Sequence, residues 1–132
     1  MKNLDILAAQ AAQQIIADTE HQGLKATDVE NLATKALGVL QENGVYAATL
    51  FLYSRSSKEA EIAPYVRKRL LELAAKEVVK KPAPSDSAQD TLKFVTDHIA
   101  EELDTLLLVK QVWEQTLIYV RYGAKARGAE KT

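Results

Sequence analysis

The sequence predicts an all-α fold, a compact bundle of five or six helices in a single domain spanning residues 1–132. Five glycines and three prolines leave long stretches of Ala, Leu, Gln, Glu and Lys, which favour helices. Apolar residues also recur three and four positions apart along most of the chain. No run alternates apolar and polar residues between turn residues, as a half-exposed strand would. A chain of this length can bury roughly two-thirds of its unfolded surface, which is enough for a core.

The first two helices are predicted over about residues 3–21 and 27–43. Asn3 can cap the first helix and Gly23 can end it. The second opens with Thr27-Asp28-Val29-Glu30, which fits a capping box, and Asn43-Gly44 allows a left-handed stop. The predicted inward faces are Leu4, Leu7, Ala8, Ala11, Ala12 and Ile15 in the first helix, and Val29, Leu32, Ala33, Ala36, Leu37 and Leu40 in the second.

The third predicted helix, residues 45–55, is apolar on nearly every side. A helix of this kind is normally surrounded by other helices, so we expect it at the centre of the bundle. It is followed abruptly by polar residues. Arg55, at its C-terminal end, carries a charge that interacts favourably with the helix dipole.

The fourth predicted helix runs from Pro64 to about Lys80. The Ser56–Glu59 segment offers another capping box, but proline disrupts a helix interior, so we expect one loose turn before Pro64. A polar, proline-broken linker follows at residues 81–87. The predicted inward face is Val66, Leu70, Leu73 and Ala74, and the opposite side is lined by Arg69, Glu72, Lys76 and Lys80.

The last two helices are predicted at about residues 88–100 and 104–127. The stripe formed by Leu92, Val95, Ile99, Leu103 and Leu106 continues across their junction, so one bent helix is an alternative. The last helix is mostly apolar from residue 106 to 120 and should be central. Trp113 falls on its apolar side. For Tyr122, near the basic end, core packing and stacking on a nucleic-acid base both stay open.

Several classes of protein do not fit this composition. The chain has no cysteine, so it holds no disulfide or thiolate metal site, as is usual in the cytoplasm, where we expect it. Asp5 interrupts what would have to be a signal peptide, and no apolar run approaches the ~20 residues that span a bilayer. We therefore expect no membrane association.

No catalytic or cofactor motif is recognisable. His21 and His98 have no neighbouring signature of a nucleophile and base. His98 and Glu102 share a helix face, but a metal site needs further ligands, so a solvated acidic face is the simpler interpretation. Gly123 and Gly128 have the glycine spacing of a phosphate-binding loop without its Lys and Ser or Thr. We expect no enzymatic activity, no metal, no cofactor and no small-molecule substrate.

The net charge of −1 conceals four blocks of alternating sign. Residues 1–54 carry −3, residues 55–81 carry +4, residues 82–109 carry −5 and residues 110–132 carry +3. If the fold brings the two basic blocks together, they form a positive surface strip, and otherwise they are solvated helix faces.

The basic residues include one suggestive group on the last helix and another on the fourth. Lys110, Arg121 and Lys125 lie along one line of the last helix, together with Glu114, and Arg127 follows. Phosphates are held by surface cations that need no precise motif. The candidate nucleic-acid contacts by charge alone are Arg67, Lys68, Arg69 and Lys110.

Two stretches resemble one known family. KALGVLQENGVYAATLFLYSRS (35–56) resembles the signature region of the small subunit of the type III-B CRISPR effector, the Cmr complex. There a helix ends at Asn-Gly, and an apolar helix then ends in an aromatic residue or Leu, a small residue and a base. LLVKQVWEQTLIYVRYGAKAR (107–127) resembles that family's C-terminal helix, which is apolar, carries aromatics and finishes Arg-x-x-Ala-like. The resemblance covers about residues 27–127.

The resemblance implies an all-α, non-catalytic small subunit whose partners are other Cmr subunits, copies of itself and a guide RNA–target RNA duplex. In that family, copies stack into an inner filament beside the backbone subunits that bind the guide RNA, and another subunit cuts the target. By position, Arg55, Arg121 and Lys125 match basic positions of the family pattern. The −5 block must then face away from RNA or meet a positive neighbour.

Two other functions remain open from the sequence. One is a structural adaptor that binds only proteins, with its basic residues on acidic surfaces. The other is a helix-turn-helix DNA regulator built from residues 27–52. Against the regulator, the segment that would read DNA, residues 45–53, carries almost no polar side chain able to reach base edges.

Overall fold

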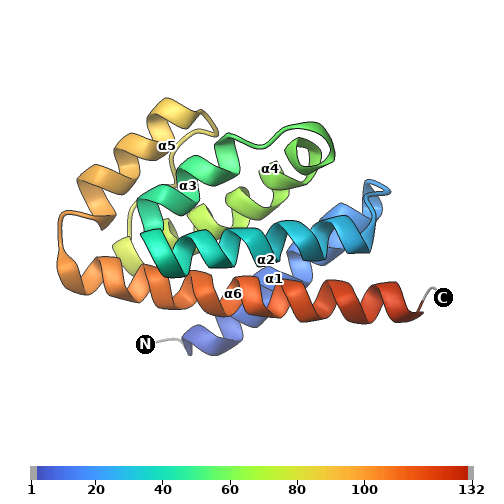
Figure 1. The fold of residues 1–132 in the computed structure, drawn as a ribbon. Helices are drawn as coiled ribbons and strands as arrows, with labels where there is room; N and C mark the ends of the chain where they lie inside the picture. Colours follow the sequence, from blue (N-terminus) through green and yellow to red (C-terminus); the bar gives the residue numbers. More distant parts are fainter. Residues whose placement is uncertain (1–2, 131–132) are drawn as a thin grey trace.

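The computed structural model describes residues 3–130 and confirms the all-α prediction (Figure 1). Lys131, counted in the last basic block, lies outside the described residues. No strand occurs within residues 3–130. The α-helices are α1 (Leu4–His21), α2 (Ala26–Asn43), α3 (Val45–Tyr53), α4 (Ser57–Glu72), α5 (Ala88–Phe94) and α6 (Leu103–Glu130), and two π-helical segments, η1 (Leu73–Val79) and η2 (Val95–Ile99), extend α4 and α5.

The long helix α6 runs along one side of the molecule, and α2 lies beside it (Figure 1). Both α1 and α2 pack extensively on α6, whereas α3, α4 and α5 pack mainly on one another, on α1 and on α2. The C-terminal part of α6 meets the end of α1 and the start of α2, because Ala124 and Gly128 border the same cleft as Ile16 and Val29. The last helix runs along one side, but the packing of both α1 and α2 on it agrees with the central place predicted for it in the bundle.

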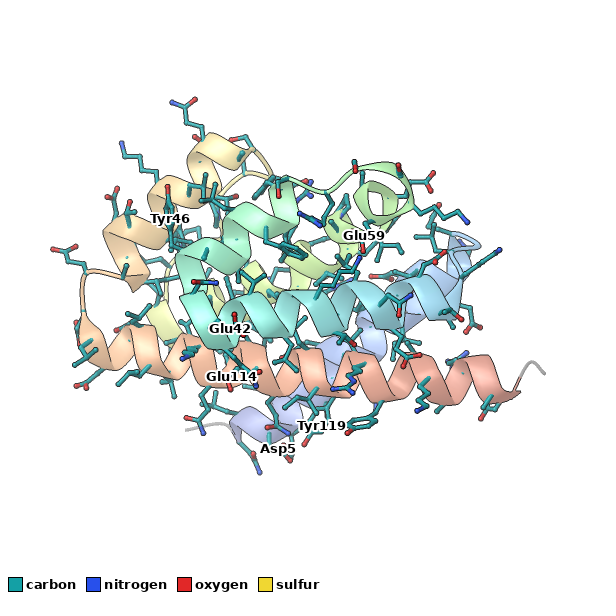
Figure 2. The ribbon with its side chains drawn as sticks, in the orientation of Figure 1. Asp5, Glu42, Tyr46, Glu59, Glu114 and Tyr119 are labelled. Carbon is teal, nitrogen blue, oxygen red and sulfur yellow. The ribbon has the colours of Figure 1, made fainter. Side chains whose placement is uncertain are left out.

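The core follows the predicted helical stripes closely. In α2 every predicted inward residue is buried, from Val29 to Leu40. Trp113 of α6 is fully buried, and its indole N–H donates a hydrogen bond of 2.8 Å to the carbonyl of Leu70 in α4. At the edge of the bundle, the Tyr119 hydroxyl of α6 donates to Asp5 near the start of α1 (Figure 2).

The helix caps agree with the prediction only in part. The Asn3 side chain accepts from the Asp5 amide at 2.9 Å, as expected. The predicted capping box at Thr27 is wrong, because α2 begins at Ala26 with Lys25 as its N-cap, which places Thr27 inside the first turn. Gly44 ends α2 with a φ of 94°, a conformation that glycine adopts without strain. Ser56 precedes α4 but makes no side-chain capping bond.

Proline does not break the fourth helix where we expected a break. Helix α4 runs continuously from Ser57 to Glu72 and contains Pro64. Proline leaves the carbonyl of Ala60 without its helical donor, but Ala60 is exposed, so water can reach that group. Burial of Ile62, Ala63 and Val66 on both sides of the proline stabilises the continuous helix.

Two apolar segments are more exposed than predicted. The chain turns at residues 100–102, so α5 with η2 and α6 are separate helices, and Leu103 is 66% exposed instead of continuing the buried stripe. Helix α3 is also only partly surrounded. Val45, Ala48 and Leu52 are buried, whereas Tyr46 and Leu50 on its outer side are exposed.

Candidate nucleic-acid interface

The fold divides the seven candidate contact residues into two groups. Arg55, Arg67 and Arg69 each form an ion pair with a carboxylate of the same chain. The other four form no ion pair with any residue between 3 and 130: Lys68, Lys110, Arg121 and Lys125. Only the second group offers a charge that the chain has not already neutralised at short range.

Arg55 is held along the C-terminal end of α3. Its Nε donates to the Phe51 carbonyl at 3.0 Å, and its guanidinium lies 3.7 Å from the centre of the Phe51 ring. This agrees with the expected interaction between Arg55 and the end of the helix. Glu59, labelled in Figure 2, accepts from Arg55 at 3.3 Å and from Lys35 at 2.8 Å. The Lys35 hydrogen bond, followed by that of Arg55, holds the pKa of Glu59 below its usual range against the effect of burial.

Arg67 joins α4 to the linker that precedes α5. Its side chain is only 14% exposed and forms two hydrogen bonds to the Asp86 carboxylate, at 2.9 and 3.2 Å. The guanidinium also lies 4.2 Å from the centre of the Tyr53 ring, whose hydroxyl donates to Asp86 at 3.0 Å. Asp86 belongs to the −5 block, so one acid of that block meets its positive neighbour within the chain itself.

Arg69 connects α4 to α1. Its guanidinium donates to Asp18 at 3.0 Å and to Glu72 at 3.3 Å. Burial alone would raise the pKa of Asp18, but hydrogen bonds from Gln14 and Arg69 outweigh it, so the pKa is lowered. The Arg69 Nε is buried without a partner in the described part of the chain.

A cleft of about 600 Å³ lies between the end of α1, α4 and the linker. Its charged lining is balanced, with three bases and three acids. Most of these charges already face one another in the Arg67 and Arg69 ion pairs. The cleft therefore does not concentrate positive charge, although Lys68 stands exposed at its edge.

Replacing Asp86 by asparagine tests the linkage between α4 and the linker. The hydrogen bond from Arg67 holds the pKa of Asp86 below its ordinary value of 3.8, so the stabilisation is fully present above that value and is lost progressively as the pH falls through the lowered pKa. Because the Asp86 side chain is 60% exposed, we expect the variant to lose only about 0.5–1 kcal/mol at neutral pH. Urea unfolding at pH 7 and at pH 3 should show a larger difference at pH 7 than at pH 3, and an equal difference at both pH values would contradict it.

The three candidates on α6 lie along one line of that helix. At ~1.5 Å per residue, Lys110 is about 22 Å from Lys125, whereas Arg121 and Lys125 are only about 6 Å apart along the axis. Glu114 interrupts the line between Lys110 and Arg121. The favourable cluster is therefore the C-terminal pair, Arg121 and Lys125.

Acidic side chains of α1 pair with an arginine of each basic block. Near the C-terminal end of α1, Asp18 pairs with Arg69 of α4, and Glu20 pairs with Arg127 of α6. Positions 18 and 20 point to roughly opposite sides of a helix, so α1 presents one acidic side chain to each basic block. Each basic block is thus partly neutralised by an acid of α1, and a positive strip joining the two blocks stays a prediction.

Tyr122 is the feature of this surface that the sequence left undecided. It is 60% exposed, so its ring is not part of the core. The Arg121 guanidinium lies 5.5 Å from the centre of the ring. The best sequence signal was its position, three residues before Lys125 and away from the buried side of the helix that holds Leu117 and Val120.

The described residues hold neither a cluster of metal ligands nor a membrane-spanning helix. Between residues 3 and 130, no group of three or more His, Asp or Glu side chains is placed to hold a metal ion. His98 lies against the ring of Phe94, with 5.1 Å between ring centres. None of the helices in this range is long and apolar enough to cross a bilayer.

Comparison with protein-family models and with curated proteins found no match to this sequence.

Proposed function

We propose that this chain is a non-catalytic small subunit of an RNA-guided, RNA-targeting effector of the type III-B (Cmr) kind. Its role is to stack with copies of itself and to contact target RNA through basic side chains. The observation that carries the proposal is that Arg121 and Lys125, two of the three residues matching basic family positions, have no acidic partner in the described chain. The third, Arg55, is paired with Glu59 and contributes less free charge.

The packing of the two resembling stretches is consistent with this proposal. Residues 35–56 form the end of α2 and all of α3, and residues 107–127 form most of α6. Helix α2 packs extensively on α6. The two segments that carry the resemblance therefore belong to one shared core.

The charges at the two ends of α6 support stacking. Helix α6 has 28 residues, a length of about 42 Å. Exposed acids surround its start, including Glu101, Glu102 and Asp104, whereas Arg121 and Lys125 lie near its end. These charges also complement the helix dipole. Opposite charges at opposite ends favour a head-to-tail contact, which repeats along a filament instead of closing into a dimer.

Contact with RNA would rest on the phosphate backbone and not on base sequence. The paired arginines of α4 are less available, so the isolated chain should bind weakly. With about three phosphate contacts on single-stranded RNA, the affinity should fall on the order of tenfold between roughly 50 and 200 mM salt.

Co-purification from cells that naturally produce the chain is the test of the proposed function. We expect a tagged full-length chain to retain several effector subunits and a short guide RNA, and we expect nuclease treatment before capture to reduce the retained RNA. Capture of proteins with no guide RNA would contradict the proposal. It would favour the structural adaptor, for which the internal pairing of Arg55, Arg67 and Arg69 is the supporting observation.

A further inference from the structure

We propose that Tyr122 is a stacking platform for an unpaired base of single-stranded RNA, with Arg121 and Lys125 holding the phosphates beside that base. The inference deepens the proposed function and rests on its RNA contact. Contacts between cations and the phosphate backbone would not by themselves involve Tyr122.

The first feature that supports base stacking is the exposure of Tyr122. Its side chain is 60% exposed, more than that of Tyr46, the other exposed aromatic, at 41%. Other tyrosines use their hydroxyls within the fold, since Tyr53 donates to Asp86 and Tyr119 donates to Asp5. The Tyr122 hydroxyl has no such partner between residues 3 and 130. The ring is therefore available to a ligand on a helix that packs on α1 and α2.

The second feature is the positive charge around the Tyr122 ring. No acidic residue occurs in the sequence between Glu114 and Glu130, while Arg121, Lys125 and Arg127 all lie there. Arg127 is paired with Glu20, which leaves Arg121 and Lys125 as the unpaired cations. The surface beside Tyr122 thus attracts a polyanion.

The third feature is the spacing of these side chains along α6. Tyr122 and Lys125 are three residues apart and Arg121 and Lys125 are four apart, so all three side chains are neighbours within about one turn. The Arg121 guanidinium is already 5.5 Å from the ring centre. Single-stranded nucleic acids are bound by this combination, in which aromatic rings stack on bases and cations hold the backbone.

Tyr46 shows why exposure alone is not enough. It is an exposed tyrosine on α3, but the nearest charged residue in the sequence is the acidic Glu42. No lysine or arginine lies within eight residues of Tyr46 in the sequence, so α3 does not place a cation of its own beside this ring as α6 does beside Tyr122. Tyr46 is therefore the matched control for Tyr122.

The test is a titration of labelled, unstructured single-stranded RNA with the full chain at about 50 mM salt. We expect Tyr122→Ala to weaken binding about tenfold without changing the salt dependence. Tyr122→Phe should keep the affinity within about twofold, because the ring that stacks is retained. Tyr46→Ala should bind as the unaltered chain does, and circular dichroism of each variant should show the unaltered helical signal.

An RNA of the same length without bases separates stacking from other effects. On that RNA the unaltered chain and Tyr122→Ala should bind equally. Unchanged binding of Tyr122→Ala to normal RNA, or an equal loss on the base-free RNA, would overturn the stacking role while leaving the backbone contact intact. If Tyr122→Ala instead weakens only the co-purification of protein subunits, Tyr122 belongs to a protein interface and the inference fails. If the unaltered chain binds no RNA at all, the RNA contact of the proposed function fails together with it.

Discussion

Replacing Trp113 by alanine is expected to lower the free energy of unfolding by about 3–5 kcal/mol, the range typical of large buried aromatic residues. Trp113 is fully buried on α6, and its indole N–H donates to the Leu70 carbonyl of α4 at 2.8 Å. The change removes the side chain that links these two helices and leaves a cavity between them. Urea unfolding followed by circular dichroism measures the loss directly.

Trp113→Phe is the control that separates packing from the hydrogen bond. Phenylalanine retains much of the apolar contact but cannot donate to Leu70, so we expect a loss of about 1–2 kcal/mol. The exposed Tyr122→Ala should change stability by less than about 0.5 kcal/mol. If Trp113→Ala proved as stable as the unaltered chain, Trp113 would not be central to the core.

Helical periodicity predicted the inward faces well because burial of a helix stripe is a local property of the sequence. All six predicted residues of α2 are buried, and so are Val66, Leu70, Leu73 and Ala74 in α4 and η1. The termini were less predictable. The start of α2 and the continuity of α4 through Pro64 depend on tertiary packing, which overrides local capping and proline signals.

The helical pattern of the sequence also could not predict which apolar residues are exposed. Leu103 continues a helical stripe in the sequence, but the turn at residues 100–102 changes the direction of the chain and leaves it exposed. Likewise, a wholly apolar α3 does not reveal which side lacks a neighbour. Tyr46 and Leu50 are exposed because α3 packs on the rest of the bundle through its other side.

The sequence predicted which basic residues could form the candidate site, but not which of them would lack an acidic partner in the folded chain. The pair of Arg55 and Glu59 is four residues apart and could have been expected from the sequence. Arg67 and Asp86 are separated by 19 residues, and Arg69 and Asp18 by 51. Such partners meet only when the helices pack. The fold therefore narrows the sequence-derived set toward the C-terminal end of α6.

Reversing the charge of both Arg121 and Lys125 to glutamate is expected to weaken binding of single-stranded RNA on the order of 100-fold at low salt. Each charge-assisted phosphate contact that is lost accounts for about 1.5 kcal/mol of this effect. The slope of log affinity against log salt should also become shallower by about 1.4, because two fewer counterions are displaced from a single strand. A titration over about 50 to 200 mM salt gives both quantities.

The matched control is Lys58→Glu with Lys93→Glu, which changes the net charge by the same amount. Both lysines are exposed, and they lie on α4 and α5 instead of α6. If the effect depends on position, the affinity of this control for RNA should fall by less than about threefold. That small loss would come from long-range repulsion, which salt screens. Equal losses in the two double variants would mean that RNA responds only to overall charge. Unaltered binding after reversal at Arg121 and Lys125 would instead remove both residues from the interface, because a polyanion held by those cations cannot tolerate two carboxylates in their place.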